Sequence, residues 1–525
     1  MKNEKNKLYL GFSFIVIIMF LIYGFSHFLK MPHGIHQWRQ SMNFSMVLNY
    51  HNNLSSFLHP TIHNLFFNDR GDILLEFPLF QWITALFPEK YYFIFRILVF
   101  LASLLGLWFT YLLSNLILKD VFWSVINVLF IVFIPIFLFY NANYMVDIPS
   151  VLFAISAIYF WHKANLIITE KKEQLKYIIV GSVFFLLSGL LRLPCIIIDL
   201  AYIASYFFFI DKKNIFFVFG SFLSLSIITG WYFYQSKINN YYVATPFKSG
   251  ITIFHLNNDE RKNIISIIVD FISNQWGFLF RNVIGWLVLF ILILFHWANY
   301  PKWLKPLLLW TFLGSMIYFF LWFKVLDAHD YYTIPLIGLF YLLVLFSLIA
   351  LKEIHNVYPF KTLLTIILIL LFSFFHAYEN FSLRSGISLK IGYYNVSKFE
   401  MGMWWWFNFE GETKWSSIRK ISPLVSDILL KHNIKKNDTA ICNFDLSPTY
   451  VLSILQLRGW SLFNNDFSDF NSYKNYASKG AKYLIHYGLK RLDSDPQKDS
   501  IIRQNLVLNM DSIFIYDIRH LKSIK

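Results

Sequence analysis

The sequence predicts a mainly α-helical membrane protein with many spans and a smaller α/β domain at its C-terminal end. Of the 525 residues, 57% are hydrophobic and only 15% are charged, and the mean hydropathy is +0.49. Soluble domains carry about 25% charged residues, and a soluble fold of this length has no place to bury so much apolar surface. After about residue 380, the apolar runs shorten to strand length and alternate with helical patterns. These observations separate a membrane domain over 1–380 from an α/β domain over 381–525.

The first apolar run, residues 8–29, is long enough to cross a bilayer. It is too long for a signal-peptide core and no small-residue cleavage site follows it, so we expect a retained transmembrane helix. About eleven spans are expected from apolar length. They cover 8–29, 92–118, 122–140, 148–162, 177–192, 194–210, 215–234, 278–296, 306–323, 334–351 and 362–378.

Lysines gather on one side of these spans, and the positive-inside rule makes that side cytoplasmic. They are Lys2, Lys5, Lys7, Lys163, Lys171, Lys172, Lys176, Lys212, Lys213, Lys302, Lys305, Lys352 and Lys361. The sequence therefore predicts a multi-pass protein of a bacterial inner membrane. Its first loop (30–91), its links at 141–147 and 324–332, its 235–277 loop and its C-terminal domain face outward.

The net charge of +15 follows largely from these flanking lysines and from a lysine-rich C-terminal region. No Arg/Lys patch with interleaved aromatics stands apart from the membrane flanks, which argues against nucleic-acid binding. The two cysteines, Cys195 and Cys442, form neither a disulfide framework nor a metal signature.

The C-terminal region reads as a small α/β domain with a partly parallel sheet. Strands are expected over 439–444, 482–486 and 512–516, with helices over 417–433 and 447–457. The region has no GxGxxG or GxxxxGK[ST] loop to cradle a phosphate. A structural or docking module is therefore favoured over a second catalytic site.

The first outer loop carries two polar features close to the membrane. His33, His36 and Arg39 lie within seven residues, and this stretch is either a solvated loop with an interfacial tryptophan or a place for proton transfer and anion binding. Glu76 stands alone among apolar residues before Pro78, where a short helix restarts at Leu79. A carboxylate in such surroundings is either paired or has a raised pKa.

Three more polar features follow on the same predicted side. Asp147 begins a span, where an acid also simply complements the helix dipole. Arg192 ends another span and either snorkels or holds a phosphate. The link before Pro335 contains the densest ionisable cluster of the membrane part, made of Lys324, Asp327, His329, Asp330, Tyr331 and Tyr332. Such a set suits a phosphate leaving group, neutralised by Arg and Lys, and a base that deprotonates an acceptor.

In order and topology, these motifs resemble glycosyltransferase family 39, which includes the protein O-mannosyltransferases and the lipid A aminoarabinose transferases. The resemblance covers about residues 8–380. It rests on a long first outer loop, Glu76-Phe77-Pro78-Leu79, Asp147-Ile148-Pro149 and the stretch from His329 to Pro335. It implies the GT-C fold and an inverting hexosyl or pentosyl transfer. The donor would be a polyprenyl-phosphate sugar, and the acceptor an envelope lipid, glycan or protein on the outer side of the inner membrane.

The resemblance also implies roles for individual residues. The family's first loop carries acids followed by an arginine, and here Arg39 matches whereas His36 and Gln37 stand where the acids would be. The catalytic base is then His36, Glu76 or Asp147. The donor phosphate would be held by Arg39, Arg192 and Lys324, and the substrate by His329, Asp330, Tyr331 and Tyr332. A divalent metal ion, and no other cofactor, is implied at Glu76 with a histidine from a later outer loop, His255 or His329.

Two other functions remain open from the residues. A transporter or flippase for lipid-linked glycans would place polar groups near the middle of spans. Here most ionisable residues lie at the outer ends, and Asp199 is an exception near the middle of a span. A non-catalytic assembly protein would act through its C-terminal domain.

Overall fold

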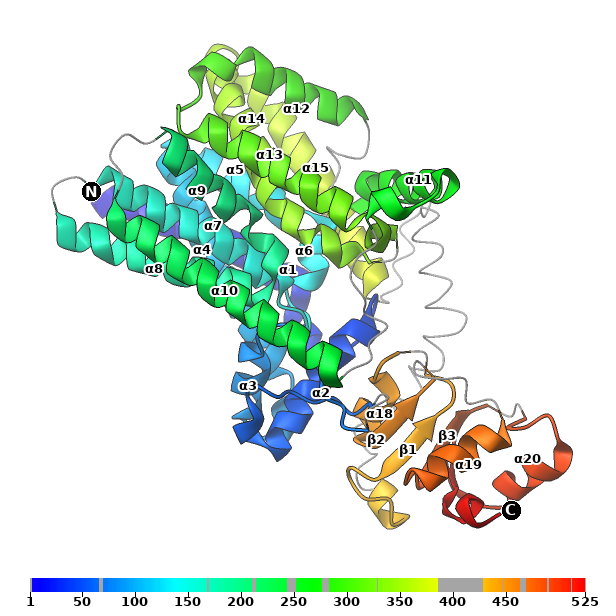
Figure 1. Ribbon diagram of the computed structural model, residues 1–525. Coiled ribbons are helices and arrows are strands. Elements are labelled where there is room, and N and C mark those ends of the chain that lie inside the picture. Colours follow the sequence, from blue (N-terminus) through cyan, green and yellow to red (C-terminus); the bar gives the residue numbers. More distant parts are fainter. Residues whose placement is uncertain are drawn as a thin grey trace. The chain divides into compact units, whose positions relative to one another are not determined.

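The computed structural model describes residues 2–65, 69–167, 170–209, 214–242, 252–275, 283–327, 329–385, 428–445, 447–462, 469–488, 491–510 and 512–524. Contacts divide the chain into two compact units (Figure 1). The membrane unit comprises Met1–Lys30, Phe95–Phe233 and Lys248–Phe399. The loop–sheet unit comprises Met31–Ile94, Tyr234–Phe247 and Glu400–Lys525.

The membrane unit is built from helices, as predicted. They are α1 (Lys2–Phe28), α4 (Ile94–Leu118), α5 (Val121–Val132), α6 (Pro135–Tyr140), α7 (Asp147–Leu166), α8 (Lys171–Leu191), α9 (Ile197–Phe209), α10 (Ile215–Tyr242), α11 (Asn258–Gln275), α12 (Val283–Phe295), α13 (Leu304–Leu321), α14 (Ile337–Val357) and α15 (Pro359–Arg384). Within the described residues, seven helices are long and apolar enough to cross a membrane, and three shorter apolar helices accompany them. The membrane character is thus confirmed, while the count of about eleven spans stays a prediction.

The segment expected as a span over 122–140 consists of two consecutive helices, and its crossing of the membrane stays a prediction. Helix α5 ends at Val132, and α6 begins at Pro135, after the extended residue Ile134. Proline has no N–H to donate and is favoured at the first position of a helix, so the chain restarts there instead of continuing.

The stretch predicted as an outer loop over 235–277 is also partly helical. Helix α11 begins with a reciprocal cap, in which Glu260 N–H donates to Oδ1 of Asn257 (2.9 Å) and Asn257 N–H donates to Oε2 of Glu260 (3.0 Å). This is the capping-box pattern, with asparagine as the first residue. Ile264 of this helix is buried with Leu256, Phe323 and Leu326.

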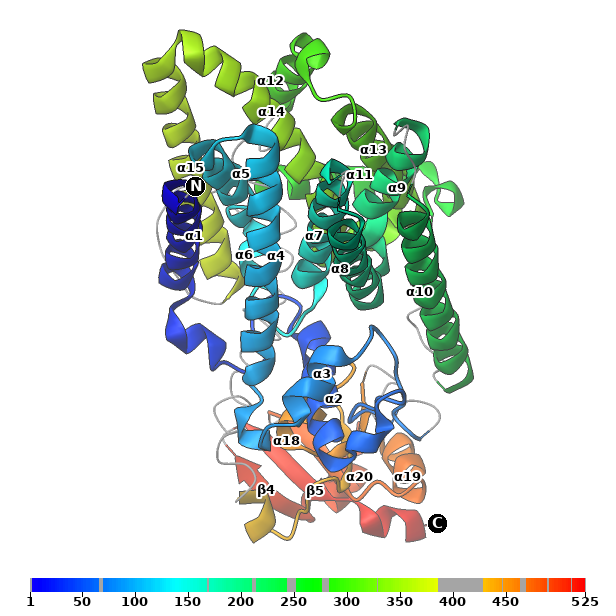
Figure 2. The ribbon, with the colours of Figure 1, turned by 90° about the vertical axis from the view of Figure 1, so that its left-hand side faces the viewer.

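Close helix packing sets the core of the membrane unit. Helices α7 and α8 run side by side (Figure 2), and α4 approaches α7 closely at Gly106. A Cβ on Gly106 of α4 would lie 2.5 Å from Cβ of Leu152 on α7, so only glycine allows this approach. Leu10 and Phe14 of α1 and Phe372 of α15 are exposed, as expected for faces that meet lipid.

The loop–sheet unit contains a five-stranded sheet with the order β2-β1-β3-β5-β4. Its elements are α2 (Gln37–Asn52), α3 (Leu79–Ala85), β1 (Thr439–Cys442), α18 (Tyr450–Leu455), β2 (Arg458–Ser461), α19 (Phe470–Ser478), β3 (Tyr483–Tyr487), α20 (Pro496–Arg503), β4 (Leu506–Met510) and β5 (Ile513–Asp517). Strand β1 is parallel to β2 and β3, whereas β5 is antiparallel to β3 and β4. The predicted strands at 439–444, 482–486 and 512–516 are therefore confirmed as β1, β3 and β5, and the sheet is partly parallel as expected.

Part of the first loop joins this sheet. Leu65 N–H donates to the carbonyl of Gly459 (2.7 Å), and Gly459 N–H donates to the carbonyl of His63 (3.0 Å). A Cβ on Gly459 would lie 1.7 Å from the carbonyl oxygen of Ala440 on β1. Asn64 thus forms a single parallel bridge with Gly459 at the edge of the sheet formed by β2. The boundary expected at residue 380 stays a prediction, and most of the helix expected over 417–433 lies outside the described residues.

Candidate functional site

Asp147 and Arg192 form a buried ion pair within the membrane unit. Asp147 is the first residue of α7, and Arg192 follows α8 in an extended conformation before a short 3-10 turn. Arg192 Nε lies 3.0 Å from Oδ1 of Asp147, and their side chains are 16% and 2% exposed. Asp147 and Arg192, which the sequence indicated separately at the ends of two spans, therefore form one ion pair.

Two tyrosines of the predicted 324–332 cluster face this cation. The guanidinium of Arg192 lies 4.9 Å from the ring centroid of Tyr332 and 5.9 Å from that of Tyr331. His329 stacks on both rings, at 5.9 and 5.5 Å between centroids. An arginine held by one carboxylate and by aromatic faces is oriented to receive a phosphate or another anion.

Asp330, predicted to bind substrate, belongs to a second ion pair in the same unit. Its carboxylate accepts hydrogen bonds from Arg384 at the end of α15 and from the hydroxyl of Tyr140 on α6. All three side chains are buried. This pair anchors the segment that carries Tyr331 and Tyr332, and the role of Asp330 in substrate binding stays a prediction. Arg384 was missed because a single arginine at the end of an apolar run reads as a membrane anchor.

Arg96 is another buried cation that the sequence analysis passed over. It lies in the first turn of α4 and donates to the carbonyl of His27 (2.9 Å) and to Oδ1 of Asn143 (3.0 Å). Its guanidinium lies 4.9 Å from the ring centroid of Tyr144. Arg96 thereby holds the link that leads into Asp147. In the sequence, Arg96 could have been recognised as a charged residue at the fifth position of the apolar run 92–118.

Glu76 and Arg39 pair within the loop–sheet unit. The Arg39 guanidinium, on the first turn of α2, donates to the Glu76 carboxylate, which is 2% exposed. Gln81 of α3 reaches the same carboxylate at 3.5 Å. His36 precedes α2 in the left-handed region (φ 53°), and Gln40 donates to the carbonyls of His33 and Ile35. The structure thus brings Arg39 and Glu76 together and makes His33 and His36 part of the turn that starts α2.

The metal implied at Glu76 does not fit the described residues. The guanidinium of Arg39 lies against the carboxylate, where a divalent cation would have to approach. His255 ends a 3-10 turn, and its Nδ1 lies 2.7 Å from the hydroxyl of Thr252. Across the parts of the chain that the structure describes, no group of three His, Cys, Asp or Glu residues could hold a metal ion.

Lys324, predicted to hold phosphate, lies in a 3-10 segment (Phe323–Asp327) of the membrane unit. With the described residues it makes no hydrogen bond or ion pair. Its place in phosphate binding therefore stays a prediction.

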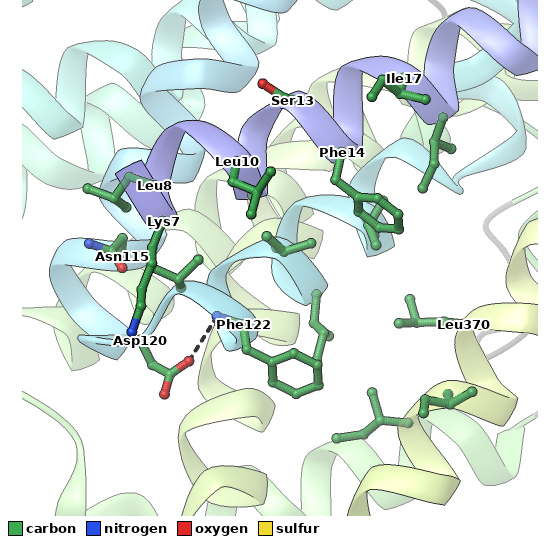
Figure 3. Close-up of a pocket in the computed structure, with 18 of the residues that line it drawn as sticks. Lys7, Leu8, Leu10, Ser13, Phe14, Ile17, Asn115, Asp120, Phe122 and Leu370 are labelled. Atoms are coloured by element: carbon green, nitrogen blue, oxygen red, sulfur yellow. Dashed lines mark hydrogen bonds between the residues drawn. The ribbon is translucent and has the colours of Figure 1, made fainter. Parts of the chain in front are cut away.

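A groove of the membrane unit is lined by none of the residues of these ion pairs. Figure 3 shows part of its lining. The groove has a volume of about 1470 Å³ and is lined mainly by apolar side chains of α1, α5 and α15, such as Phe14, Phe122 and Leu370. Lys7 and Asp120 stand at one end. Its lining suits hydrocarbon chains, so we place the chemistry elsewhere.

The fold is that of known GT-C glycosyltransferases. The crystal structure of ArnT from Cupriavidus metallidurans bound to undecaprenyl phosphate matches with a TM-score of 0.59 and 12% identity, over 96% of this chain and 97% of that one. The apo structure of the same protein matches with a TM-score of 0.57 and 10% identity over the whole of both chains.

The apo crystal structure of the Archaeoglobus fulgidus oligosaccharyltransferase matches with a TM-score of 0.55 and 12% identity, over 91% of this chain and 69% of that one. No family model and no curated protein matches the sequence. At these identities the similarity establishes the fold, and the predicted GT-C fold class is confirmed.

Proposed function

We propose that the protein is a glycosyltransferase that moves a sugar from a polyprenyl-phosphate donor to an acceptor of the cell envelope. The observation that carries this proposal is the Asp147–Arg192 pair, a carboxylate and a guanidinium held together next to Tyr332. The shared fold supports it, because one neighbour of that fold is bound to undecaprenyl phosphate. We place the protein in a bacterial inner membrane, with the first loop and the C-terminal domain outside, from the distribution of lysines.

The pair suggests how donor binding prepares the base. A donor phosphate carries negative charge and competes with Asp147 for the Arg192 guanidinium, which binds phosphate and carboxylate with the same two-pronged geometry. When phosphate takes Arg192, the Asp147 carboxylate loses its cationic partner and becomes a better proton acceptor. Donor binding therefore activates Asp147 as the base, and without donor the ion pair with Arg192 keeps Asp147 a weak proton acceptor.

The transfer is a single displacement in this account. An acceptor hydroxyl or amine attacks the anomeric carbon on the face opposite the phosphate, and Asp147 takes the acceptor proton. The new bond to the anomeric carbon forms as the bond from that carbon to the phosphate oxygen breaks. Polyprenyl phosphate leaves with its charge neutralised by Arg192. This order inverts the configuration at the sugar.

The experiment that tests this function offers the purified full-length protein radiolabelled polyprenyl-phosphate sugars with an envelope extract as acceptor. The function predicts label in the acceptor fraction for at least one donor. Glu173→Gln, a change of an exposed acid on the lysine-rich side, serves as the matched control. Absence of both donor binding and transfer for all common sugars would contradict the proposal.

One observation favours a second candidate, a transporter for lipid-linked glycans. Asp199 of α9 is fully buried, and neither carboxyl oxygen has a hydrogen-bond partner among the residues the structure describes. Ionisable groups inside a membrane protein often mark transport pathways. Reconstituted vesicles that move a fluorescent polyprenyl-phosphate sugar between leaflets, and lose this activity in Asp199→Leu, would favour the transporter over the transferase.

A further inference from the structure

The loop–sheet unit contains a pocket in which every lining residue is polar. It has a volume of about 670 Å³ and eleven lining residues, four of them asparagines. Its walls come from α2, the loop that follows α2, and the sheet, with Asn49, Asp72 and Arg458 as examples. Small-molecule sites of about 300–1,000 Å³ are usually lined by hydrophobic side chains, so this composition excludes an apolar ligand.

The walls of the pocket are fixed, while hydrogen-bonding groups remain open inside it. Asn49 Nδ2 donates to the hydroxyl of Thr61 (3.1 Å), and an Nη of Arg458 donates to the carbonyl of Arg70 (2.9 Å). Among the described residues, Nε of Arg458 is buried without a hydrogen-bond partner. The Asp72 side chain likewise has no ion-pair or hydrogen-bond partner in those parts of the chain. The site therefore offers the partly exposed Asp72 carboxylate to a ligand, whereas Nε of Arg458 is buried in the pocket wall.

The charges of the pocket select the class of ligand. Asp69 and Asp72 balance Arg70 and Arg458, so the formal charge of the lining is zero, with His59 neutral. A phosphate would meet two carboxylates, and a divalent cation would meet two guanidinium groups. Amides, carboxylates and guanidinium groups in this number fit a neutral molecule with many hydroxyls, each of which donates and accepts hydrogen bonds.

The pocket and Arg39 lie at two positions along the same helix, α2. Both Arg39 and Asn49 belong to α2, ten residues apart, which at 1.5 Å per residue is about 15 Å along the helix. Glu76, the partner of Arg39, follows Asp72 by four residues in the chain. The pocket and the Arg39–Glu76 pair therefore lie at different positions along one helix, whose intervening residues 40–48 are buried.

We propose that this pocket binds a neutral glycan, the non-reacting part of the acceptor. The proposal rests on the proposed transferase function and narrows its acceptor to a sugar chain, in place of a peptide or a bare lipid. Asn49, Asn52, Asp72 and Arg458 act as the specificity-determining residues. Asn49 and Asp72 hold sugar hydroxyls by hydrogen bonds, and exposed Asn52 forms the rim.

The test measures glycan binding without any donor, by saturation-transfer NMR on the full-length protein in nanodiscs. The probes are maltotriose, mannotriose and chitotriose, with trigalacturonic acid as an anionic comparison. We expect at least one neutral trisaccharide to bind with a Kd of about 1 mM, because each hydrogen bond replaces one to water. Asp72→Ala and Asn49→Ala should each weaken binding about tenfold.

Two further variants keep the result interpretable. Asn52→Trp, at the exposed rim, should block binding while leaving the unfolding temperature unchanged. Asn471→Ala, an exposed asparagine of α19 outside the pocket, should bind as the unchanged protein does. The proposal is overturned when no neutral trisaccharide binds at about 20 mM, twentyfold above the expected Kd. It is also overturned when trigalacturonic acid binds as tightly as the neutral trisaccharide. The same holds when the Kd for the trisaccharide is unchanged in the pocket variants.

A parallel donor-hydrolysis assay separates this proposal from the proposed function. If the unchanged protein turns over the polyprenyl-phosphate donor but binds no neutral trisaccharide, the pocket proposal alone is contradicted. Glycan binding without any donor turnover contradicts the transferase alone.

Discussion

Arg192 contacts Asp147 through Nε at 3.0 Å, and its guanidinium carbon lies over the ring of Tyr332, 4.9 Å from the centroid. The three residues come from the end of α8, the start of α7 and the 3-10 segment before α14 (Asp330–Leu336). One cation therefore connects three parts of the membrane unit. A ligand that draws Arg192 away from Asp147 therefore removes the cationic partner of the Asp147 carboxylate and the contact of Arg192 with the Tyr332 ring at the same time.

Replacing Arg192 by lysine tests whether the planar guanidinium matters. Lysine keeps the charge but loses the two-pronged contact to phosphate and the stacking on tyrosine. We expect kcat/KM for the lipid donor to fall about tenfold or more, with the larger part in KM. Lys305→Gln, on the lysine-rich side, is the control. Unchanged donor KM in Arg192→Lys would show that the phosphate binds elsewhere.

The Arg39–Glu76 pair should be needed for stability of the loop–sheet unit. Both side chains are buried, so removing one leaves an uncompensated charge, which costs about 3–5 kcal/mol. We expect Glu76→Gln to lower the unfolding temperature clearly and to reduce activity. The double variant Arg39→Met, Glu76→Leu removes both charges and should recover most of the stability without recovering transfer. Recovery of transfer as well would make the pair purely structural.

His63 should make the loop–sheet unit sensitive to acid. It is fully buried, and burial lowers the pKa of its imidazole from 6.5 to about 3, with smaller contributions from Arg458 and Lys436. Below pH 6.5, His63 becomes protonated in the unfolded chain but stays neutral in the folded state. The free energy of unfolding therefore falls as pH decreases. The loss is about 2 kcal/mol between pH 7 and pH 5 from this side chain.

Hydrogen exchange of the β1 and β2 amides at several pH values measures that loss. The variant His63→Gln should flatten the profile, whereas His432→Gln, at an exposed histidine, should leave it unchanged. An identical pH profile in His63→Gln would assign the acid sensitivity to other groups.

Gly459→Ala should loosen the junction between the first loop and the sheet. The added Cβ would meet the Ala440 carbonyl at 1.7 Å, and Gly459 also exchanges hydrogen bonds with His63 and Leu65. We expect faster proteolysis within residues 31–94 and lower stability of the sheet. Gly480→Ala, where a Cβ meets nothing within 4 Å but φ is also positive (+106°), controls for backbone strain. Equal effects of the two substitutions would remove the steric explanation.

The positions of the polar site residues could be predicted, since Asp147, Arg192 and Tyr332 stand out against apolar runs. Their pairing could not, because it depends on how α7, α8 and the 324–332 link pack together. The same limit hid Arg384 and Arg96, whose partners are carbonyl, amide and carboxylate oxygens far away in the sequence. The GT-C fold was implied by the resemblance to glycosyltransferase family 39, which the order of the motifs carries.

Local signals explain the remaining differences. Strand β2 was missed because Arg458 and Gly459 read as the end of a helix, and its extended form depends on neighbours on both edges. The capping pair Asn257 and Glu260 did mark α11 in the sequence, within a stretch assigned to a loop on polarity alone. Pro135 likewise marked the break between α5 and α6.

The central claim is that Asp147 deprotonates the acceptor once donor phosphate occupies Arg192. The measurement that tests it most directly is single-turnover transfer from a radiolabelled polyprenyl-phosphate sugar by Asp147→Asn, with donor binding followed in the same samples. The account predicts donor binding at least as tight as in the unchanged protein, because the phosphate no longer competes with a carboxylate for Arg192. It predicts transfer reduced by tenfold or more, about 1.4 kcal/mol in the barrier. Transfer at the unchanged rate by Asp147→Asn would contradict it.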